Sequence, residues 1–458
     1  KSSQKISRRD FITKSSAVAA AFMIVPRYVL GGPGYTAPSD KINIAAIGVG
    51  GKGRSDIAAV ATENIVALCD VDDVKMFDTI KRAGEWAEEK GLSENPLTKV
   101  PRYKDFREML DKQKDIDAVT VSTPDHFHAV AAITAIKQGK HAFVQKPLTY
   151  SVDEAQKLSA AAKKAGVVTQ MGNQGHAGEG IRLIGEWLKD GAIGEVREVH
   201  CWTNRPIWDT GMNRPAEIPS VPPTLDWNQW IGPAPFRPYH PDYAPWSWRA
   251  WCDFGTGALG DMGAHIFDIP YHTLKMDHPT SVFASSSKFN GESWPVASTI
   301  YYEFPQRGSL PPVKLTWYDG GIMPSRPEGI EPGRRMGDGD GGIMFYGDKG
   351  MIMCGCYGRN PRLVPETSMK EYQRPPKTLS RSPGIHEEWV QCIKESKQAS
   401  SNFDYAARLT STMLLGNIAI RMAPRSTKLE WDGIAGKFTN MDEANDYLGR
   451  EYRDGWNL

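Results

Sequence analysis

A glycine-rich run near the start of the chain has the spacing of a nucleotide-binding turn. Gly48, Gly50 and Gly53 form a G-x-G-x-x-G pattern directly after the apolar run 42–47. The first glycine of such a turn makes the bend, the second lets the backbone approach a pyrophosphate, and the third lets helix and strand pack closely. Asp70 follows Gly53 by seventeen residues, close to the spacing of a carboxylate that bonds a ribose 2′-hydroxyl. Because a carboxylate there would repel a 2′-phosphate, the pattern predicts NAD rather than NADP.

Three other residues have side chains suited to the oxidation of an alcohol. The imidazole of His265 titrates near neutrality, as a base that removes a hydroxyl proton must. Asp261 lies four residues earlier, so on a helix the two share a face and the carboxylate can orient the ring. A lysine ammonium such as that of Lys146 stabilises a developing alkoxide where water is excluded. The alternatives are a helix N-cap for Asp261 and a core histidine for His265.

Alternating strand and helix signals are expected to position these residues. Short apolar runs occur at 42–47, 65–69, 118–121 and 141–144. Strands that alternate with helical stretches of about ten to fifteen residues indicate a parallel, doubly wound sheet. The glycine turn follows the first run, Asp70 the second and Lys146 the fourth. We therefore expect an α/β fold that begins with a Rossmann domain.

The second half of the chain has a different pattern. Strand-like stretches rich in β-branched and aromatic residues occur at 196–204, 282–289, 298–304 and 312–318. Their succession predicts an α+β domain with a large, mostly antiparallel open sheet. The Pro- and Trp-rich segment 215–251 is expected to be an ordered loop rather than a linker. The predicted parts are an N-terminal arm at 1–40, the Rossmann domain at 41–172, a substrate and oligomerisation domain at 173–385, and C-terminal helices with a tail, packing back on the Rossmann domain, at 386–458.

Four motifs occur in this order along the chain: the glycine turn, Thr-Pro-Asp-His-Phe-His at 123–128, Lys-Pro at 146–147, and Gly-Asp-Met-Gly-Ala-His-Ile-Phe-Asp at 260–268. This set resembles the Gfo/Idh/MocA family of sugar and inositol oxidoreductases over nearly all of residues 41–440. The resemblance implies that Lys146 and His265 are the catalytic pair, with Asp261 beside them. One position departs from the family pattern, because Gln145 stands where a glutamate is usual and so removes a charge next to Lys146.

The candidate site residues fall into three groups. The predicted cofactor-binding residues are Gly48, Gly50, Gly51, Lys52, Gly53, Asp70, Ser122, Thr123, Pro124, His128 and Lys146. The predicted catalytic residues are Lys146, His265 and Asp261, and the predicted substrate contacts are Asn173, His176, Asp261 and His265. For His128, helix capping is an equal alternative to placement beside the cofactor. Trp202, Trp208, Trp246, Trp248 and Trp251 suit either stacking on a sugar or packing in a core.

The leading hypothesis for function is an NAD-dependent dehydrogenase that acts on a secondary hydroxyl of a sugar or glycoside, with tightly bound cofactor. A second hypothesis is an NAD-dependent glycosidase that oxidises its substrate transiently, eliminates a group and reduces the product again. A third is a sugar-binding relative without turnover, for which Gln145 is the only sign. Intact Lys146 and His265 favour the first two.

Composition narrows the classes of partner and compartment. Lys plus Arg number 55 and Asp plus Glu 54, so no basic field indicates nucleic acid or an anionic membrane. The six cysteines lack paired zinc-ligand spacing, and we expect no metal site and mostly buried cysteines.

The start of the chain matches a twin-arginine export signal, with Ser-Arg-Arg-Asp-Phe-Ile-Thr-Lys at 7–14 followed by the apolar run 17–25. This apolar run is too short to span a bilayer. We expect a periplasmic protein that can retain its N-terminal arm, with a sugar or glycoside as its small-molecule partner, assembled as a homodimer or homotetramer through the open sheet face.

Overall fold

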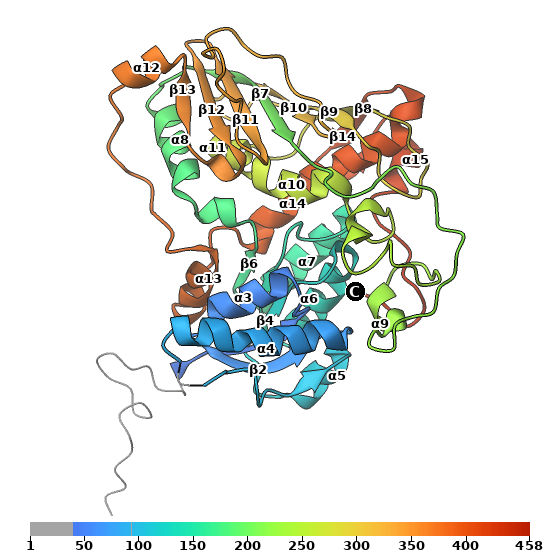
Figure 1. Ribbon diagram of the computed structural model, residues 1–458. Helices are drawn as coiled ribbons and strands as arrows, with labels where there is room; N and C mark the ends of the chain where they lie inside the picture. The colour runs from blue at the N-terminus through green and yellow to red at the C-terminus, as the bar shows by residue number, and fades with distance from the viewer. Residues whose placement is uncertain (1–39, 93) are drawn as a thin grey trace, which may run out of the picture. The chain divides into compact units, whose positions relative to one another are not determined.

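The computed structural model describes residues 40–92 and 94–458, and the predicted export signal lies outside them. Two β-sheets with their helices make up residues 43–458 (Figure 1). The first sheet is parallel throughout. Its strands, in sheet order, are β3 (Arg102–Tyr103), β2 (Asn64–Cys69), β1 (Asn43–Ile47), β4 (Ala118–Val121), β5 (His141–Val144) and β6 (Thr169–Met171). This is the Rossmann strand order, and it confirms the predicted doubly wound sheet.

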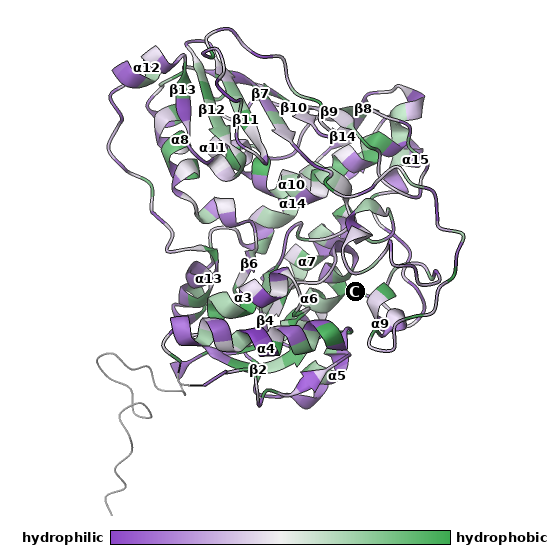
Figure 2. Cartoon of the chain, viewed as in Figure 1, coloured by the Kyte–Doolittle hydropathy of each residue, from purple (hydrophilic) through white to green (hydrophobic). Residues whose placement is uncertain are grey.

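Helices cover both faces of this sheet, which is why its central strands are apolar on both sides. β4 is buried at every position, and β1 from Ile44 onward; a sheet covered on one face only would alternate. The helices are α3 (Lys52–Val60), α4 (Asp73–Glu89), α5 (Phe106–Lys112), α6 (His128–Lys137) and α7 (Val152–Ala165). Short polar residues cap three of the helices: Asp72 caps α4, Asp105 caps α5, and Ser151 forms a capping box with Glu154 in α7. Figure 2 shows hydrophilic residues along α4, which buries only Met76, Thr79, Ala83 and Ala87.

The second sheet has nine strands and is mostly antiparallel, as expected. Only the central pair of β7 and β10 is parallel. In sheet order the strands are β13 (Arg362–Val364), β12 (Met351–Gly355), β11 (Gly341–Gly347), β7 (Val196–Thr203), β10 (Val313–Tyr318), β9 (Ser298–Phe304), β8 (Ser281–Ser286), β14 (Leu429–Asp432) and β15 (Lys437–Phe438). The four strands predicted from sequence are β7 to β10. The Gly- and Met-rich β11 and β12 each contain only one β-branched residue, Ile343 and Ile352, so they lack the density of β-branched residues that identified those four.

One face of the second sheet packs on helices. Val199, Leu315 and Trp317 point to that side and belong to the same buried cluster as Met262 and Leu415. Figure 1 places α10 and α14 between the two sheets, and α14 contacts both α7 and β8. The remaining helices longer than one turn are α8 (Glu179–Lys189), α9 (Trp227–Ile231), α10 (Gly257–Ile266), α11 (Asp268–Thr273), α12 (Glu366–Glu371), α13 (Ile385–Lys394), α14 (Phe403–Met422) and α15 (Asp442–Asn445). Of the two C-terminal helices predicted from sequence, α13 contacts α3 and α14 contacts α7.

The segment 215–251, here called the aromatic segment, is ordered and has its own core. Trp227 and Trp230 stack with ring centroids 4.8 Å apart, and Trp251 is fully buried in the same cluster. Backbone hydrogen bonds attach the segment to the Rossmann domain, from the Asp73 amide to Thr224 O at 3.0 Å and from the Asp226 amide to Val71 O at 2.9 Å. The aromatic segment is therefore fixed beside the carboxyl end of β2.

The cysteines behave as small core residues, as predicted. All six are free thiols, and all but Cys392 are buried. Across residues 40–92 and 94–458, no group of three or more His, Cys, Asp or Glu side chains is arranged to hold a metal ion. In the same described ranges, no helix combines the length and the apolar character needed to cross a membrane.

Candidate active site

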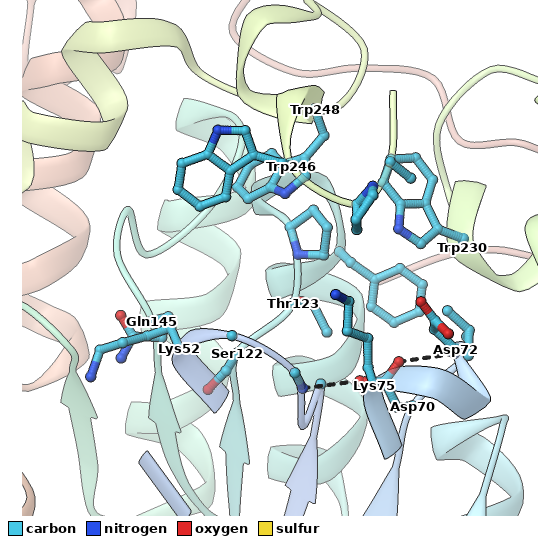
Figure 3. Close-up of a pocket in the computed structure, with 18 of the residues that line it drawn as sticks. Lys52, Asp70, Asp72, Lys75, Ser122, Thr123, Gln145, Trp230, Trp246 and Trp248 are labelled. Atoms are coloured by element: carbon cyan, nitrogen blue, oxygen red, sulfur yellow. Dashed lines mark hydrogen bonds between the residues drawn. The ribbon is translucent and has the colours of Figure 1, made fainter. Parts of the chain in front are cut away.

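A cavity of about 860 Å³ opens at the carboxyl ends of the central Rossmann strands. The Rossmann domain contributes the glycine turn, Asp70, residues 122–125 and residues 145–146, and α10 contributes the facing wall. Figure 3 shows Trp246 and Trp248 on the opposite side of the cavity from Ser122 and Thr123. Ligands of doubly wound sheets bind at this edge, so the topology itself brings the sequence-predicted groups together.

The glycine turn has the close backbone packing that its spacing predicts. Gly48 has a φ of +79°, which favours glycine. A Cβ on Gly53 would lie 2.0 Å from the carbonyl oxygen of Gly48. α3 therefore starts directly against the turn, and its first amides lie at the edge of the cavity, where a helix N-terminus attracts phosphate.

Asp70 lies at the end of β2 and lines the cavity. Its Oδ2 accepts hydrogen bonds from the amides of Val49 at 2.8 Å and Gly50 at 3.3 Å, and its Oδ1 accepts from the Asp72 amide at 3.0 Å. Burial raises the pKa of this carboxyl group. Asp70 thus holds the glycine turn in place at the wall of the cavity.

Two observations test whether the residues present fit a dinucleotide. Positions 48 and 53 leave no room for a Cβ, so the turn presents bare backbone to the cavity. The hydroxyl oxygen of Thr123 is buried, lines the cavity and has no hydrogen-bond partner within the described part of the chain. A buried hydroxyl without a partner is costly and is satisfied by a polar ligand. The residues fit NAD.

Gln145 takes part in a buried network centred on Asp56. The Asp56 carboxylate accepts hydrogen bonds from Lys52 Nζ at 2.7 Å, Ser122 Oγ at 2.8 Å, Gln145 Nε2 at 2.8 Å and His386 Nε2 at 2.9 Å. Although burial disfavours the charged form, the His386 hydrogen bond and the Lys52 charge hold the pKa of Asp56 below its ordinary value. The side chain before Lys146 is therefore neutral, and the neighbouring negative charge comes from α3.

Lys146 reaches across from the Rossmann domain to α10. Its Nζ donates to the Asp261 carboxylate at 2.7 Å and to the Asp261 carbonyl oxygen at 2.6 Å. Asp261 lies inside α10, whose N-cap is Thr256, so the N-cap alternative for Asp261 is wrong. Burial opposes ionisation, but the charges of Lys146 and Arg249 hold the pKa of Asp261 well below its ordinary value. An ionised carboxylate thus fixes the lysine ammonium in the cavity.

His265 lies one helical turn after Asp261 and lines the same cavity. Its ring packs against Tyr357 with centroids 4.6 Å apart, and its Nδ1 is buried without a hydrogen-bond partner among the described residues. Burial and the nearby Lys146 charge hold the pKa of His265 well below its ordinary value, which makes the imidazole neutral. The Asp261 carboxylate accepts hydrogen bonds from Lys146 and Arg249. No hydrogen bond joins Asp261 to the His265 ring in this structure, although the sequence predicted that Asp261 would orient it.

Four residues predicted to touch ligand do not line the cavity. Gly53 packs against the Gly48 carbonyl oxygen instead. His128 is buried, with its ring nitrogens 2.8 Å from Pro147 O and 2.9 Å from Thr123 O. His176 Nδ1 lies 2.9 Å from the Asp268 carboxylate, and the Asn173 side-chain oxygen accepts from Ser401 Oγ at 2.8 Å. His128 thus joins the segments that carry Thr123 and Lys146, and His176 contacts α11. Asn173 contacts the residues just before α14.

The part of the cavity around Lys146, Asp261 and His265 is here called the reactive end. Sequence reasoning missed three residues that line it: Arg205, Arg249 and Tyr357. None belongs to a motif with recognisable spacing. Arg205 follows β7, Arg249 ends the aromatic segment and Tyr357 follows β12, so only the tertiary fold brings them together. For Arg249, the surrounding Trp246, Trp248 and Trp251 were a usable signal. Of the five tryptophans considered, only Trp246 and Trp248 line the cavity.

Comparison with known proteins gives a match for each domain. Residues 42–173 match the model of an oxidoreductase family described as an NAD-binding Rossmann fold. Residues 195–304 match the model of the C-terminal α/β domain of that oxidoreductase family. Together the two matches cover more than half of the chain.

Individual relatives are more distant. A glycosyl hydrolase family 109 protein of Solibacter usitatus is 36% identical over 124 residues, which are 26% of this chain and 27% of that protein. Levoglucosan dehydrogenase of Pseudarthrobacter phenanthrenivorans is 26% identical over 166 residues, 36% of this chain and 34% of that protein. The matched stretches thus span less than half of each relative.

Solved structures extend the likeness over most of the fold. The crystal structure of a levoglucosan dehydrogenase with NADH and L-sorbose has a TM-score of 0.52 and 18% sequence identity, covering 85% of this chain and 98% of that one. At this identity the likeness concerns the fold alone. With both family models matched in order along one chain, the protein belongs to the Gfo/Idh/MocA family of NAD-binding oxidoreductases.

Proposed function

We propose that this protein oxidises a secondary hydroxyl of a sugar or glycoside with NAD. The observation that carries the proposal is that Lys146 and His265 line the same cavity as the glycine turn. A positioned base and a cation at the developing alkoxide are the two groups that alcohol oxidation requires from a protein.

Each residue has a separate task in this reaction. The neutral imidazole of His265 accepts the hydroxyl proton. Lys146 stabilises the oxygen as negative charge develops, and Asp261 keeps the Lys146 ammonium in position through the 2.7 Å hydrogen bond. NAD, when bound, accepts the hydride from the substrate carbon.

A sugar fits the lining of the cavity and the names of relatives. Trp246 and Trp248 present aromatic rings to the reactive end, and such rings pack on the C–H faces of sugars as well as on other apolar surfaces. A levoglucosan dehydrogenase is among the relatives. We therefore place the sugar between α10 and the two tryptophans.

A second candidate function is a redox-neutral one, in which the sugar is oxidised, loses a group and is reduced again. Two observations favour it. One relative is named a glycosyl hydrolase family 109 protein. In addition, Leu225, Gln229 and Trp230 of the aromatic segment line the cavity beside Asp70, where they would cover a bound ribose and slow cofactor release. A retained cofactor must be regenerated within the site.

The pH dependence of the reaction should reflect the surroundings of His265. A base acts in its deprotonated form, and the pKa of this imidazole lies well below 6.5 because of burial and Lys146. We expect kcat/KM to stay level from about pH 8 to below pH 6.5 and to fall only at more acid pH. Steady-state rates over this range, with thermal melting at each pH as a control for unfolding, check the expectation. A decline centred at pH 6.5 would show that the imidazole is not desolvated in this way.

We also propose that the protein is exported by the twin-arginine route and assembles as a homodimer or homotetramer. The proposal of export rests on the sequence at 7–25 alone, and loss of export in an Arg8→Lys/Arg9→Lys variant tests it.

The proposal of assembly is supported by the open face of the second sheet, where Tyr301 is 44% exposed and His200 stacks on Tyr318. An aromatic sheet face of this kind is usually covered. A monomer mass by light scattering at micromolar concentration would contradict assembly.

The nucleotide carried by the purified protein tests the proposed function. After denaturation, the released nucleotide should be NAD or NADH rather than a 2′-phosphorylated form, because Asp70 lines the cavity beside the glycine turn and a carboxylate repels a phosphate. Addition of sugars or glycosides to the native protein should then change the nicotinamide absorbance. A protein that carries NAD but gives no absorbance change with any sugar would support the third hypothesis, a binding protein without turnover.

A further inference from the structure

At the reactive end of the cavity, three cations are paired with two carboxylates, Asp261 and, for Arg205, also Asp340 at 3.5 Å. The Asp261 carboxylate is contacted by three cations. Lys146 Nζ lies 2.7 Å and Arg249 Nε 3.2 Å from Oδ1, and Arg205 Nε lies 3.6 Å from Oδ2. Nearby Asp125 is buried and accepts hydrogen bonds from the amide and hydroxyl groups of Thr256, and burial raises the pKa of its carboxyl group.

Both guanidinium groups retain donors that no described residue uses. Arg249 donates through Nε only, while its guanidinium lies 4.2 Å from the ring centroid of Trp248. That stacking fixes the plane of the fork and leaves both terminal nitrogens unpaired. Arg205 uses one terminal nitrogen for Asn204 and Asp340 and leaves the other free. The two side chains are 23% and 16% exposed, and both line the cavity.

A neutral sugar would leave these donors poorly paired. When a substrate displaces water, a cation that loses hydration without gaining an anionic partner is costly. Hydroxyl groups accept hydrogen bonds but do not compensate a net charge. A planar guanidinium fork matches the paired oxygens of a carboxylate or a sulfate.

We propose that the substrate carries an anionic oxygen group, a uronic carboxylate or a sulfate ester, which Arg249 and Arg205 bind beside the reacting carbon. This inference rests on the proposed function, because it assigns the substrate class of the same site. Arg249 is the main specificity residue, since it offers two free nitrogens on a plane fixed by Trp248. Arg205 contributes the second contact from the end of β7.

The competing assignment for these arginines is the pyrophosphate of the cofactor. The geometry favours the sugar, because both guanidinium groups contact the carboxylate that also holds Lys146. The glycine turn has cations of its own, Lys52, which is paired with Asp56, and Lys75, whose side chain lies against Gly50. Replacement of Arg249 should therefore change sugar selectivity and leave NAD content unchanged.

Three matched probes test the inference with the purified holoprotein: methyl glucoside, its 6-sulfate, and methyl glucuronide. Calorimetry should show that at least one anionic probe binds about 10- to 100-fold more tightly than methyl glucoside, the range typical of a hydrogen-bonded ion pair. Arg249→Gln should remove most of that preference and Arg205→Gln part of it. Arg425→Gln, at an exposed residue paired with Glu443, is the control and should leave the preference intact. The tighter of the two anionic probes identifies the group.

The outcomes separate this inference from the proposed function. Equal binding of the neutral and both anionic probes by the unmodified holoprotein would overturn it. So would an Arg249→Gln variant that loses NAD but keeps the anion preference, because the arginine would then serve the cofactor. If the anionic probe binds through Arg249 but no probe changes the nicotinamide absorbance, the anion site stands and the oxidation chemistry is wrong.

Discussion

Replacement of Lys146 or His265 by alanine should each lower turnover by about 10²- to 10⁴-fold, the usual contribution of a positioned acid–base group. His265 is the neutral base, and Lys146 carries the ammonium at the reacting oxygen. Both act on one oxygen in one step, so the double variant should lose far less than the product of the two single losses. Steady-state kinetics of the three variants give this comparison. NAD content should be nearly unchanged, because neither residue lies in the glycine turn.

Controls are needed because Lys146 is part of a buried ion pair. Removal of one partner of a buried ion pair can destabilise a protein by about 3–5 kcal/mol. We expect a smaller loss here, because Asp261 would still be paired with Arg249 and Arg205. Thermal melting of each variant separates lost stability from lost chemistry, and Lys146→Met retains the volume of the side chain. Lys157→Ala at an exposed position and His278→Ala at a partly exposed one change the same residue types outside the cavity and should retain full turnover. Full activity in a folded His265→Ala variant would remove the base from the mechanism.

Gly53→Ala should disrupt the cofactor site through the backbone alone. The added Cβ would lie 2.0 Å from the Gly48 carbonyl oxygen, so α3 and the turn would have to separate. Overpacking of this kind costs about 1–3 kcal/mol or more, and we expect a lower Tm together with a large loss of bound NAD. Nucleotide content per chain and thermal melting measure both effects.

Gly84→Ala is the matched control for that variant. Gly84 lies in α4, and a Cβ there would meet nothing closer than 3.9 Å. Alanine favours the helix by about 0.5–1 kcal/mol relative to glycine, so this variant should be as stable as the unmodified protein or more so. A Gly53→Ala protein with the same Tm and full NAD content would contradict the packing argument.

Local sequence was sufficient for the cofactor half of the site. A buried strand, a glycine turn and a helix start are contiguous in the chain, so the conformation at Gly48 and the packing at Gly53 follow from short-range geometry. The position of Asp70 could be predicted because it directly follows the second apolar run, which forms β2. Parallel sheet topology then brings all strand ends to one edge, which is why residues 122–124 and Lys146 also line the cavity.

The substrate half depends on long-range packing that no spacing reveals. Arg205 and Tyr357 come from neighbouring parts of the second sheet, and Arg249 comes from a loop attached to the Rossmann domain. The role of Gln145 could not be predicted either, because its partner Asp56 lies 89 residues earlier in the chain, on α3. Conversely, Asn173 and His176 occupy the expected junction but do not line the cavity: the Asn173 side-chain oxygen accepts from Ser401, and His176 Nδ1 pairs with Asp268.

The central claim is hydride transfer between a sugar carbon and NAD, and a single-turnover experiment tests it most directly. The holoprotein is mixed rapidly with a glycoside deuterated at every ring carbon and, separately, with the protiated form, while the nicotinamide absorbance is followed. We predict a rapid absorbance change that is slower with the deuterated glycoside and absent in the His265→Ala variant. An absorbance that does not change with an otherwise bound glycoside, or that remains normal in the variant, would contradict the account.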